Sequence, residues 1–178
     1  MNINEYQNYH ETKAHTSAEF PYNTYLCSIP LDFPGVPLHW HDELELVVIK
    51  RGQGFVSVDF DKRLVHSGDI IIIPPRCLHA IEQDDTFKME YENIIFKPDL
   101  LASGANDLCM IQYIVPLLDG SLPIEYFLTP ALGSFEALSN CIRQIDLVCA
   151  DQTPGWQLAV KSSLFNFFFL LISERQKK

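Results

Sequence analysis

The chain has 178 residues, of which 47% are hydrophobic and 20% are charged, and its formal net charge is −10. This length and composition predict one globular domain with at most a small appendage, and they exclude a disordered chain. The negative charge argues against direct contact with DNA, because affinity for nucleic acid comes largely from Lys and Arg side chains that neutralise phosphates.

The cysteines and the apolar segments indicate the cellular compartment in which the protein is expected. The cysteines form no CxxC pair, which predicts reduced thiols in the cytosol. Residues 1–15 are polar and lack the apolar core of a secretion signal. The apolar run 164–172 is shorter than the roughly 20 residues that cross a bilayer, so it predicts a buried helix. We therefore expect a cytoplasmic protein without a membrane segment.

The first half of the chain has the texture of a β domain. Residues 1–22 show no period and are expected to form an arm. Strands are expected at 24–29, 43–50, 54–60, 62–66, 69–74 and 87–97, where Val, Ile, Phe and Tyr alternate with turns of Gly, Pro and Asp. The spacing leaves no room for helices between strands. It therefore excludes a parallel α/β sheet and predicts a sandwich or a jelly-roll barrel.

The second half becomes helical. Prolines interrupt residues 99–133, with a return strand expected at 124–128. A stripe with 3-4 spacing then predicts a helix capped by Ser134. Thr153 and Pro154 are expected to open a second helix over 155–174, with Pro154 at its first position.

The second helix is apolar on nearly all faces, so it needs partners on most of them. Two interpretations remain open: burial between the barrel and the first helix, or a dimer interface. The interface residues expected from the two helices are Phe135, Leu138, Ile142, Ile145, Leu164, Phe167, Phe168 and Leu171. The polar end at 174–178 is interpreted as a linker cut short.

Two segments carry residues suited to chemistry. His39, His41 and Glu45 share parity, so in an extended strand they point to one face, which in a narrow barrel is the interior. Gly68 opens a strand of four isoleucines, and the following turn at Pro74 and Pro75 brings back His79. We expect the three histidines and Glu45 to meet in one pocket.

These segments resemble the two motifs of the cupin superfamily. The first motif is a His-x-His pair, a Glu four residues on and a Gly after six more; the second is a Gly, a Pro six residues later and a His five beyond it. The matching positions are His39, His41, Glu45 and Gly52, then Gly68, Pro74 and His79. The resemblance implies a mainly β (α+β) fold, a cupin double-stranded β-helix or jelly-roll barrel, followed here by a C-terminal α-helical pair. Phe33, Arg76 and Gln83 depart from the motifs, which weakens the case for a metal-dependent enzyme.

The runs 39–52, 67–79 and 92–101 are more specifically similar to the N-terminal sensor domain of AraC-type transcription regulators. This resemblance implies an arm at 1–22, a cupin barrel at 23–133 and a dimerisation pair at 134–178. It also implies a helix-turn-helix DNA-binding domain beyond residue 178, through which alone DNA would be contacted. A small-molecule effector, such as a sugar or an organic acid, would occupy the barrel of a homodimer.

The expected pocket has two interpretations. Three imidazoles and a carboxylate suit a divalent metal such as Zn, Ni, Fe or Mn. The same groups can instead form a hydrogen-bonded polar floor for an organic effector. The resemblance favours the effector and a protein that is not an enzyme. The alternative is a stand-alone metal-dependent cupin enzyme, an isomerase or a dioxygenase.

Four further side chains lie next to the motif residues in the sequence. Trp40 has the opposite parity and is expected to pack outside, against the helices. Glu43 is expected at a solvated rim. Arg76 is included in the pocket as a clamp for an anionic effector, with a surface role as the alternative. Cys77 is interpreted as a small packing residue.

Overall fold

The computed structural model describes residues 3–105 and 107–175. The chain divides into two compact units, Met1–Phe127 and Leu128–Lys178, and each is described by itself. The domain limits expected above, 1–22, 23–133 and 134–178, stay predictions. Positions 1–2 of the expected arm and 176–178 of the expected linker lie outside the described residues.

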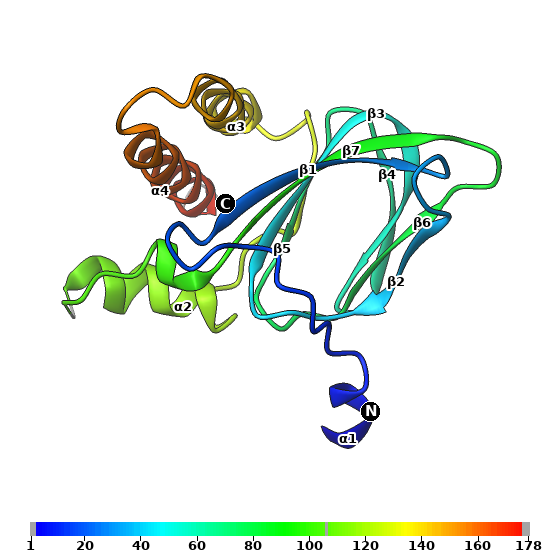
Figure 1. The fold of residues 1–178 in the computed structure, drawn as a ribbon, viewed down its shortest axis with the longest axis horizontal. Helices are drawn as coiled ribbons and strands as arrows, with labels where there is room; N and C mark the ends of the chain where they lie inside the picture. Colours follow the sequence, from blue (N-terminus) through cyan, green and yellow to red (C-terminus); the bar gives the residue numbers. More distant parts are fainter. Residues whose placement is uncertain (1–2, 106, 176–178) are drawn as a thin grey trace. The chain divides into compact units, whose positions relative to one another are not determined.

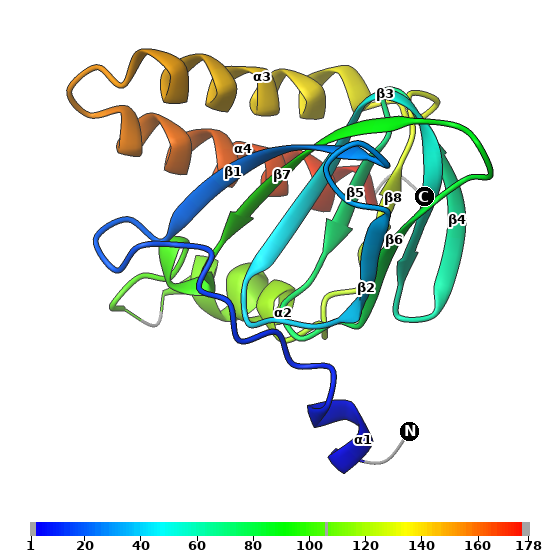
Figure 2. The same cartoon turned by 45° about the vertical axis from the view of Figure 1, so that its right-hand side comes forward.

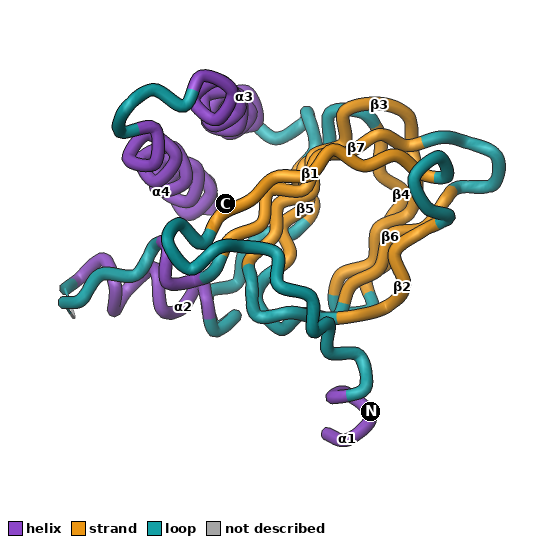
Figure 3. The backbone as a smooth tube through the Cα atoms, viewed as in Figure 1, coloured by secondary structure: helices purple, strands orange, loops and turns teal. Residues whose placement is uncertain are grey.

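The first unit is built on antiparallel strands that form a jelly roll (Figures 1 and 3). The strands are β1 (Tyr22–Ile29), β2 (Gly35–His39), β3 (Leu44–Val58), β4 (Asp61–His66), β5 (Ile70–Ile73), β6 (His79–Gln83), β7 (Met89–Phe96) and β8 (Phe127–Leu128). One side has the order β1-β7-β3-β5-β8, and the other joins β4, β3, β6 and β2. The mainly β barrel followed along the chain by two long helices confirms the expected fold class.

Strand β3 belongs to both sides of the barrel. Its first part pairs with β7 and its last part, from Gly54, pairs with β6. The change takes place at Gly52, whose φ is +77°, and a Cβ there would lie 1.8 Å from the Lys88 carbonyl oxygen. Only glycine tolerates this bend. The two strands expected at 43–50 and 54–60 are therefore one continuous strand, bent where a separating turn was expected.

The barrel interior is filled mainly by aliphatic side chains. The buried cluster comprises Ile29, Val47, Ile49, Val56, Val58, Val65, Ile71, Ile73, Ile81, Met89, Tyr91 and Phe127. All four isoleucines of β5 are buried, as expected for a strand covered on both faces. The polar site described below interrupts this apolar interior.

Short helical segments complete the first unit. They are α1 (Ile3–Gln7), η1 (Pro98–Leu100), η2 (Met110–Ile114) and α2 (Val115–Leu118). η2 and α2 form one continuous helical run, and Pro116 follows its π-helical turn. The return strand expected at 124–128 is reduced to β8.

The second unit is a pair of packed helices, α3 (Phe135–Asp151) and α4 (Trp156–Arg175), which lie side by side in Figure 2. α4 begins two residues after Pro154, because Gly155 adopts a φ of +89°. The prediction that Pro154 occupies the first helical position was therefore wrong. Ser134 precedes α3 but makes no side-chain cap, and its hydroxyl is buried.

The helical pair buries most of the residues expected at a dimer interface. Within the single chain Phe135 is half-buried, and the following side chains are buried: Leu138, Ile142, Ile145, Leu164, Phe167, Phe168 and Leu171. The apolar side chains that α4 exposes are Leu158, Phe165 and Phe169, which lie on one face at intervals of seven and four residues. By length and composition alone, Trp156–Glu174 is also long and apolar enough to cross a membrane, a property shared with core helices of soluble proteins.

Candidate functional site

The barrel encloses a cavity of ≈ 320 Å³. Its walls are formed by residues of β1, β2, β3, β6 and β7, together with the arm. The lining is Glu11, Lys13, His15, Tyr25, Cys27, Phe33, Gly35, Val36, Pro37, His39, His41, Glu45, His79, Ile81, Tyr91, Asn93 and Ile95. Strand alternation therefore places polar groups at one part of an otherwise apolar interior.

The structure brings His39, His41, Glu45 and His79 together. His39 lies opposite His79 in the register of β2 and β6, with ring centroids 4.1 Å apart. His41 lies in the turn after β2, 4.9 Å from the His79 ring. Glu45 Oε2, on β3, is 3.0 Å from His41 Nε2 and 3.4 Å from His79 Nε2. His39, His41 and Glu45 do not share one extended strand, as the parity argument assumed; β2, the turn after it and β3 carry them, and β6 adds His79.

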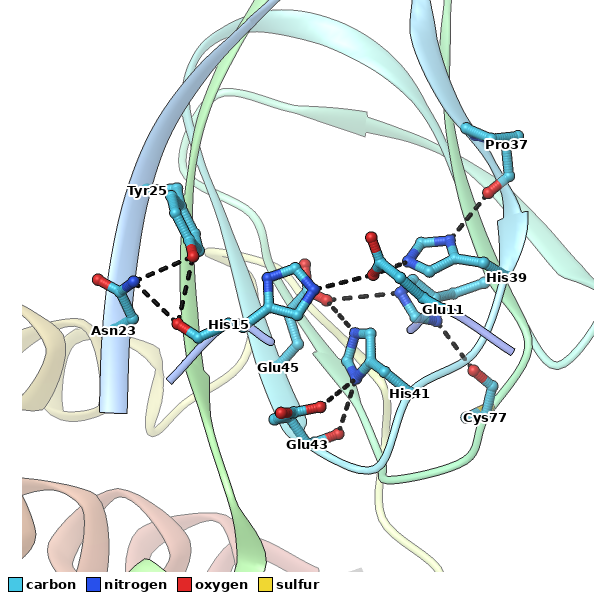
Figure 4. Close-up of polar contacts among 11 residues, drawn as sticks. Glu11, His15, Asn23, Tyr25, Pro37, His39, His41, Glu43, Glu45 and Cys77 are labelled. Atoms are coloured by element: carbon cyan, nitrogen blue, oxygen red, sulfur yellow. Dashed lines mark hydrogen bonds and ion pairs between the residues drawn. The ribbon is translucent and has the colours of Figure 1, made fainter. Parts of the chain in front are cut away.

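Backbone carbonyls fix the orientation of the three imidazoles (Figure 4). Each Nδ1 atom lies at hydrogen-bonding distance from a carbonyl oxygen: 2.8 Å to Pro37 for His39, 3.2 Å to Glu43 for His41 and 2.9 Å to Cys77 for His79. A carbonyl oxygen only accepts, so each Nδ1 carries the proton. In a neutral imidazole the Nε2 atom is then an acceptor.

This arrangement calls for a cation. The Nε2 atoms of His41 and His79 face Glu45, so acceptors face an acceptor unless a proton or a metal ion lies between them. His79 Nε2 is buried, and besides Glu45 Oε2 at 3.4 Å it has no hydrogen-bond partner among the residues that the structure describes. One ring nitrogen from each of the three histidines lies within 4.8 Å of the other two. Carbonyl-oriented imidazoles with a carboxylate fit a divalent metal such as Zn, Ni, Fe or Mn.

The local electrostatics keep Glu45 ionised. Burial raises the pKa of Glu45, but contacts with His41 and His79 outweigh burial and hold its pKa well below the usual range. Burial, followed by the nearby His79, lowers the pKa of His39. Burial also lowers the pKa of His79, but the Glu45 carboxylate more than offsets it, so this pKa is raised. The ionised carboxylate is the form that binds a cation.

The N-terminal arm closes one side of the cavity. Glu11, Lys13 and His15 alternate along the arm and all three line the cavity. Glu11 Oε2 is 2.9 Å from His15 Nε2 and 3.5 Å from His39 Nε2. The hydrogen bond with His15 is the main reason that the pKa of Glu11 is lowered. The sequence argument missed these residues because the arm has no apolar period; alternation of titratable side chains was the available signal.

Trp40 holds the arm. Its ring stacks on Tyr6 and on His10, with centroids 4.8 and 4.2 Å apart. Its indole N–H donates to the Tyr6 carbonyl at 2.8 Å, and its carbonyl accepts from the Glu11 N–H at 2.9 Å. Trp40 was expected to pack against the C-terminal helices, whereas the structure stacks it on the arm.

Glu43, Arg76 and Cys77 are close in sequence to the histidines of the site. Glu43 is buried, not solvated, with its Oε2 3.7 Å from His41 Nδ1. Arg76 has a φ of +63°, and its exposed guanidinium donates to Asp42 at 2.8 Å, outside the cavity lining. At this exposed position the Arg76 charge stays hydrated, whereas inside the cavity it would lose its water. The predicted role of Arg76 as a clamp in the pocket was therefore wrong. Burial raises the pKa of the Cys77 thiol to about 12, which suits a packing residue.

Comparison with known proteins places the chain. Residues 23–168 match a family model described as the AraC-like ligand binding domain. The chain belongs to this family. An uncharacterized HTH-type transcriptional regulator of Bacillus subtilis, YdeC, is 32% identical over 159 residues, which is 89% of this chain and 54% of the relative. A second regulator of that organism, YbfI, is 26% identical over 72 residues, 40% of this chain and 26% of the relative.

This AraC-like ligand binding domain therefore spans about half the length of the first relative. Among solved structures, a cupin protein from Bacteroides fragilis matches 52% of this chain and 75% of its own, with 23% identity and a TM-score of 0.40. The family resemblance expected from the two histidine motifs is confirmed by the family match.

Proposed function

We propose that the chain is the effector-sensing part of an AraC-type transcription regulator and binds a small polar molecule in the barrel. The observation that carries this proposal is a set of buried polar atoms that line the cavity without a hydrogen-bond partner in the described part of the chain. These atoms include His15 Nδ1 and Asn93 Oδ1. Buried polar groups are normally paired, so a ligand with matching groups would complete them.

The cavity suggests the chemical class of the effector. Its volume, ≈ 320 Å³, is at the small end for ligand pockets. Tyr91 and Asn93 offer groups for hydroxyls, and Lys13, 5.3 Å from the centre of the Tyr25 ring, offers a positive charge. A small hydroxylated organic acid or a sugar matches this lining, with the acid favoured by Lys13.

A thermal-shift screen of metal-free protein against small hydroxy acids and sugars tests the proposal. A ligand at about 100 times its Kd should stabilise the protein by about 2.7 kcal/mol. Asn93→Leu should weaken that ligand about tenfold or more, because the bound molecule would lose a buried hydrogen bond. Tyr113→Phe, remote from the cavity lining, is the control. Equal stabilisation of wild type and Asn93→Leu would contradict this binding site.

The regulatory role rests on the relatives. Both curated relatives carry the name HTH-type transcriptional regulator, and the chain spans about half of the first. We propose that a helix-turn-helix domain follows residue 178 in the full protein, that DNA is contacted through it, and that the protein is cytoplasmic. The net charge of −10 supports a ligand-binding role for this chain and DNA contact through a separate domain. Unlike a cupin isomerase or dioxygenase, the sensor should return its ligand chemically unchanged after prolonged incubation.

We also propose a homodimer through the exposed stripe of α4, Leu158, Phe165 and Phe169, in place of the buried residues expected earlier. Exposed apolar patches of this kind mark interaction surfaces. Phe169→Asp should convert a dimer to a monomer in analytical ultracentrifugation without unfolding it, because Phe169 is 63% exposed. Leu26→Asp, equally apolar and 79% exposed on β1, is the control. A Phe169→Asp protein that remains dimeric would rule out this stripe.

A further inference from the structure

We propose that Glu11 of the N-terminal arm is a further ligand for a divalent metal held by the three histidines and Glu45, so that the metal fastens the arm to the barrel. His15 acts as the positioning residue for Glu11. The inference rests on the proposed sensing role of the cavity and adds a second input to it.

The first observation is the position of the Glu11 carboxylate relative to the imidazoles. Glu45 faces His41 and His79 from the barrel, and Glu11 faces His39 from the arm at 3.5 Å. The His39 Nδ1 proton is committed to the Pro37 carbonyl. Its Nε2 lone pair therefore meets a carboxylate, which is again an acceptor facing an acceptor. A cation at this point satisfies both sides of the cluster.

The second observation is the support that the arm gives to Glu11. His15 Nε2 lies 2.9 Å from Glu11 Oε2, and only one of these two atoms can donate, so His15 carries the proton. Metal-ligating carboxylates are commonly held by such outer hydrogen bonds. The other nitrogen of His15 is buried without a partner among the described residues, which leaves it open to a bound effector.

The donor set then joins two parts of the chain. Three imidazole nitrogens and one carboxylate come from the barrel strands and their turn, and the second carboxylate comes from the arm. A mixed set of nitrogen and oxygen donors suits Zn, Ni, Fe or Mn. Because the arm residues that contact Trp40 lie within five residues of Glu11, an ion bound by Glu11 would stabilise the docking of the whole segment. Because the metal would bind more tightly when Glu11 is in place, a bound metal would favour the arm in its docked position on the barrel.

The experiment uses the tag-free chain stripped of metal, with Zn²⁺ as the probe. Zinc affinity is measured by competition with a fluorescent chelator for wild type, Glu11→Gln and the matched control Glu19→Gln, which alters an exposed arm carboxylate. Glu11→Gln should weaken zinc about tenfold or more, and Glu19→Gln should leave it unchanged. His15→Ala should give a smaller loss, because Glu11 remains but is no longer held.

The arm gives an independent readout. Trypsin can cut after Lys13, and zinc should slow this cut about tenfold in wild type but little in Glu11→Gln. In a Trp156→Phe background Trp40 is the remaining tryptophan, so its fluorescence reports the stacking of Tyr6 and His10 as zinc is added.

Three outcomes would overturn the inference. The first is no binding of Zn²⁺, Ni²⁺ or Mn²⁺ at metal concentrations up to 100 times the protein concentration. The second is equal zinc affinity of wild type and Glu11→Gln. The third is zinc binding that leaves the rate of cleavage after Lys13 unchanged. In each case an organic effector that still stabilises the metal-free protein would leave the proposed sensing function standing.

Discussion

The cavity has two walls of different construction. The barrel wall carries His39, His79 and Glu45 on hydrogen-bonded strands. The arm wall carries Glu11 and His15 on a segment held at Trp40 and by side-chain hydrogen bonds from Asn23 and Tyr25 to the His15 carbonyl. The barrel wall is part of a cooperative core, so its groups are fixed before any ligand arrives. The arm wall has few backbone bonds to the barrel and can open at a lower free energy than global unfolding. The site therefore combines a rigid barrel wall with an arm wall whose position can respond to a bound ligand.

The largest effect is expected from breaking the barrel wall at the bend of β3. Gly52→Ala forces a Cβ against the Lys88 carbonyl and places alanine at a φ of +77°. We expect a loss of about 3 kcal/mol or more in the free energy of unfolding, measured by urea denaturation. Gly104→Ala is the control, because a Cβ there would meet no atom within 4 Å. A Gly52→Ala protein as stable as the control would show that the bend is not constrained.

The next effect concerns the buried charge on the barrel wall. Glu45→Gln in metal-free protein should cost about 3 kcal/mol near pH 5.5, because it leaves the histidines without their counter-charge. The folded pKa of Glu45 is lowered, so its contribution is present above the unfolded value of about 4.3 and is lost as the pH falls further. The folded pKa of His79 is raised, so its contribution is present below about 6.5 and is lost as the pH rises through the folded value.

The stability difference between wild type and Glu45→Gln should therefore be largest between about pH 4.3 and 6.5 and smaller on both sides. Urea midpoints at several pH values provide the measurement. Glu90→Gln, a half-exposed carboxylate on β7, should change stability by less than about 0.5 kcal/mol. A difference that stays constant from pH 3 to 9 would contradict the coupling of Glu45 with the histidines.

The smallest effect on global stability is expected from the arm wall. Tyr6→Ala removes one stacking contact with Trp40 and a hydrogen bond from the tyrosine hydroxyl to the Arg76 carbonyl. We expect about 1 kcal/mol of lost docking, seen as trypsin cleavage after Lys13 about five to ten times faster. The urea midpoint of the barrel should barely move. If instead both quantities fell together, the arm and the barrel would unfold as one unit.

The sequence predicted the barrel wall better than the arm wall, for a physical reason. Strand alternation and two spaced motifs brought His39, His41, Glu45 and His79 to one place without any structure. The parity argument nevertheless treated residues 39–45 as one strand, whereas β2 ends at His39 and β3 starts at Leu44. The pairing of β2 with β6, which sets His39 opposite His79, has no local signal because it joins residues forty positions apart.

The arm and the helix ends show where local reasoning failed. Residues 1–22 lack an apolar period, and the alternation of titratable side chains was the one local sign that Glu11, Lys13 and His15 would enter the cavity. Ser134 takes the N-cap position of α3 but makes no side-chain cap hydrogen bond. Pro154 lies two residues before α4, because Gly155 between them has a φ of +89°. Burial of the helical stripe in one chain likewise depends on packing that periodicity does not reveal.

The tripeptide His39-Trp40-His41 has a consequence for how this domain can change over time. Two of its side chains enter the cavity, and the one between them holds the arm by stacking. Loss or gain of a single residue here would exchange the two roles, because neighbouring side chains leave an extended backbone on opposite sides. We expect length variation between Gly35 and Glu45 to be far more damaging than substitution. The loop at 102–105 should tolerate both.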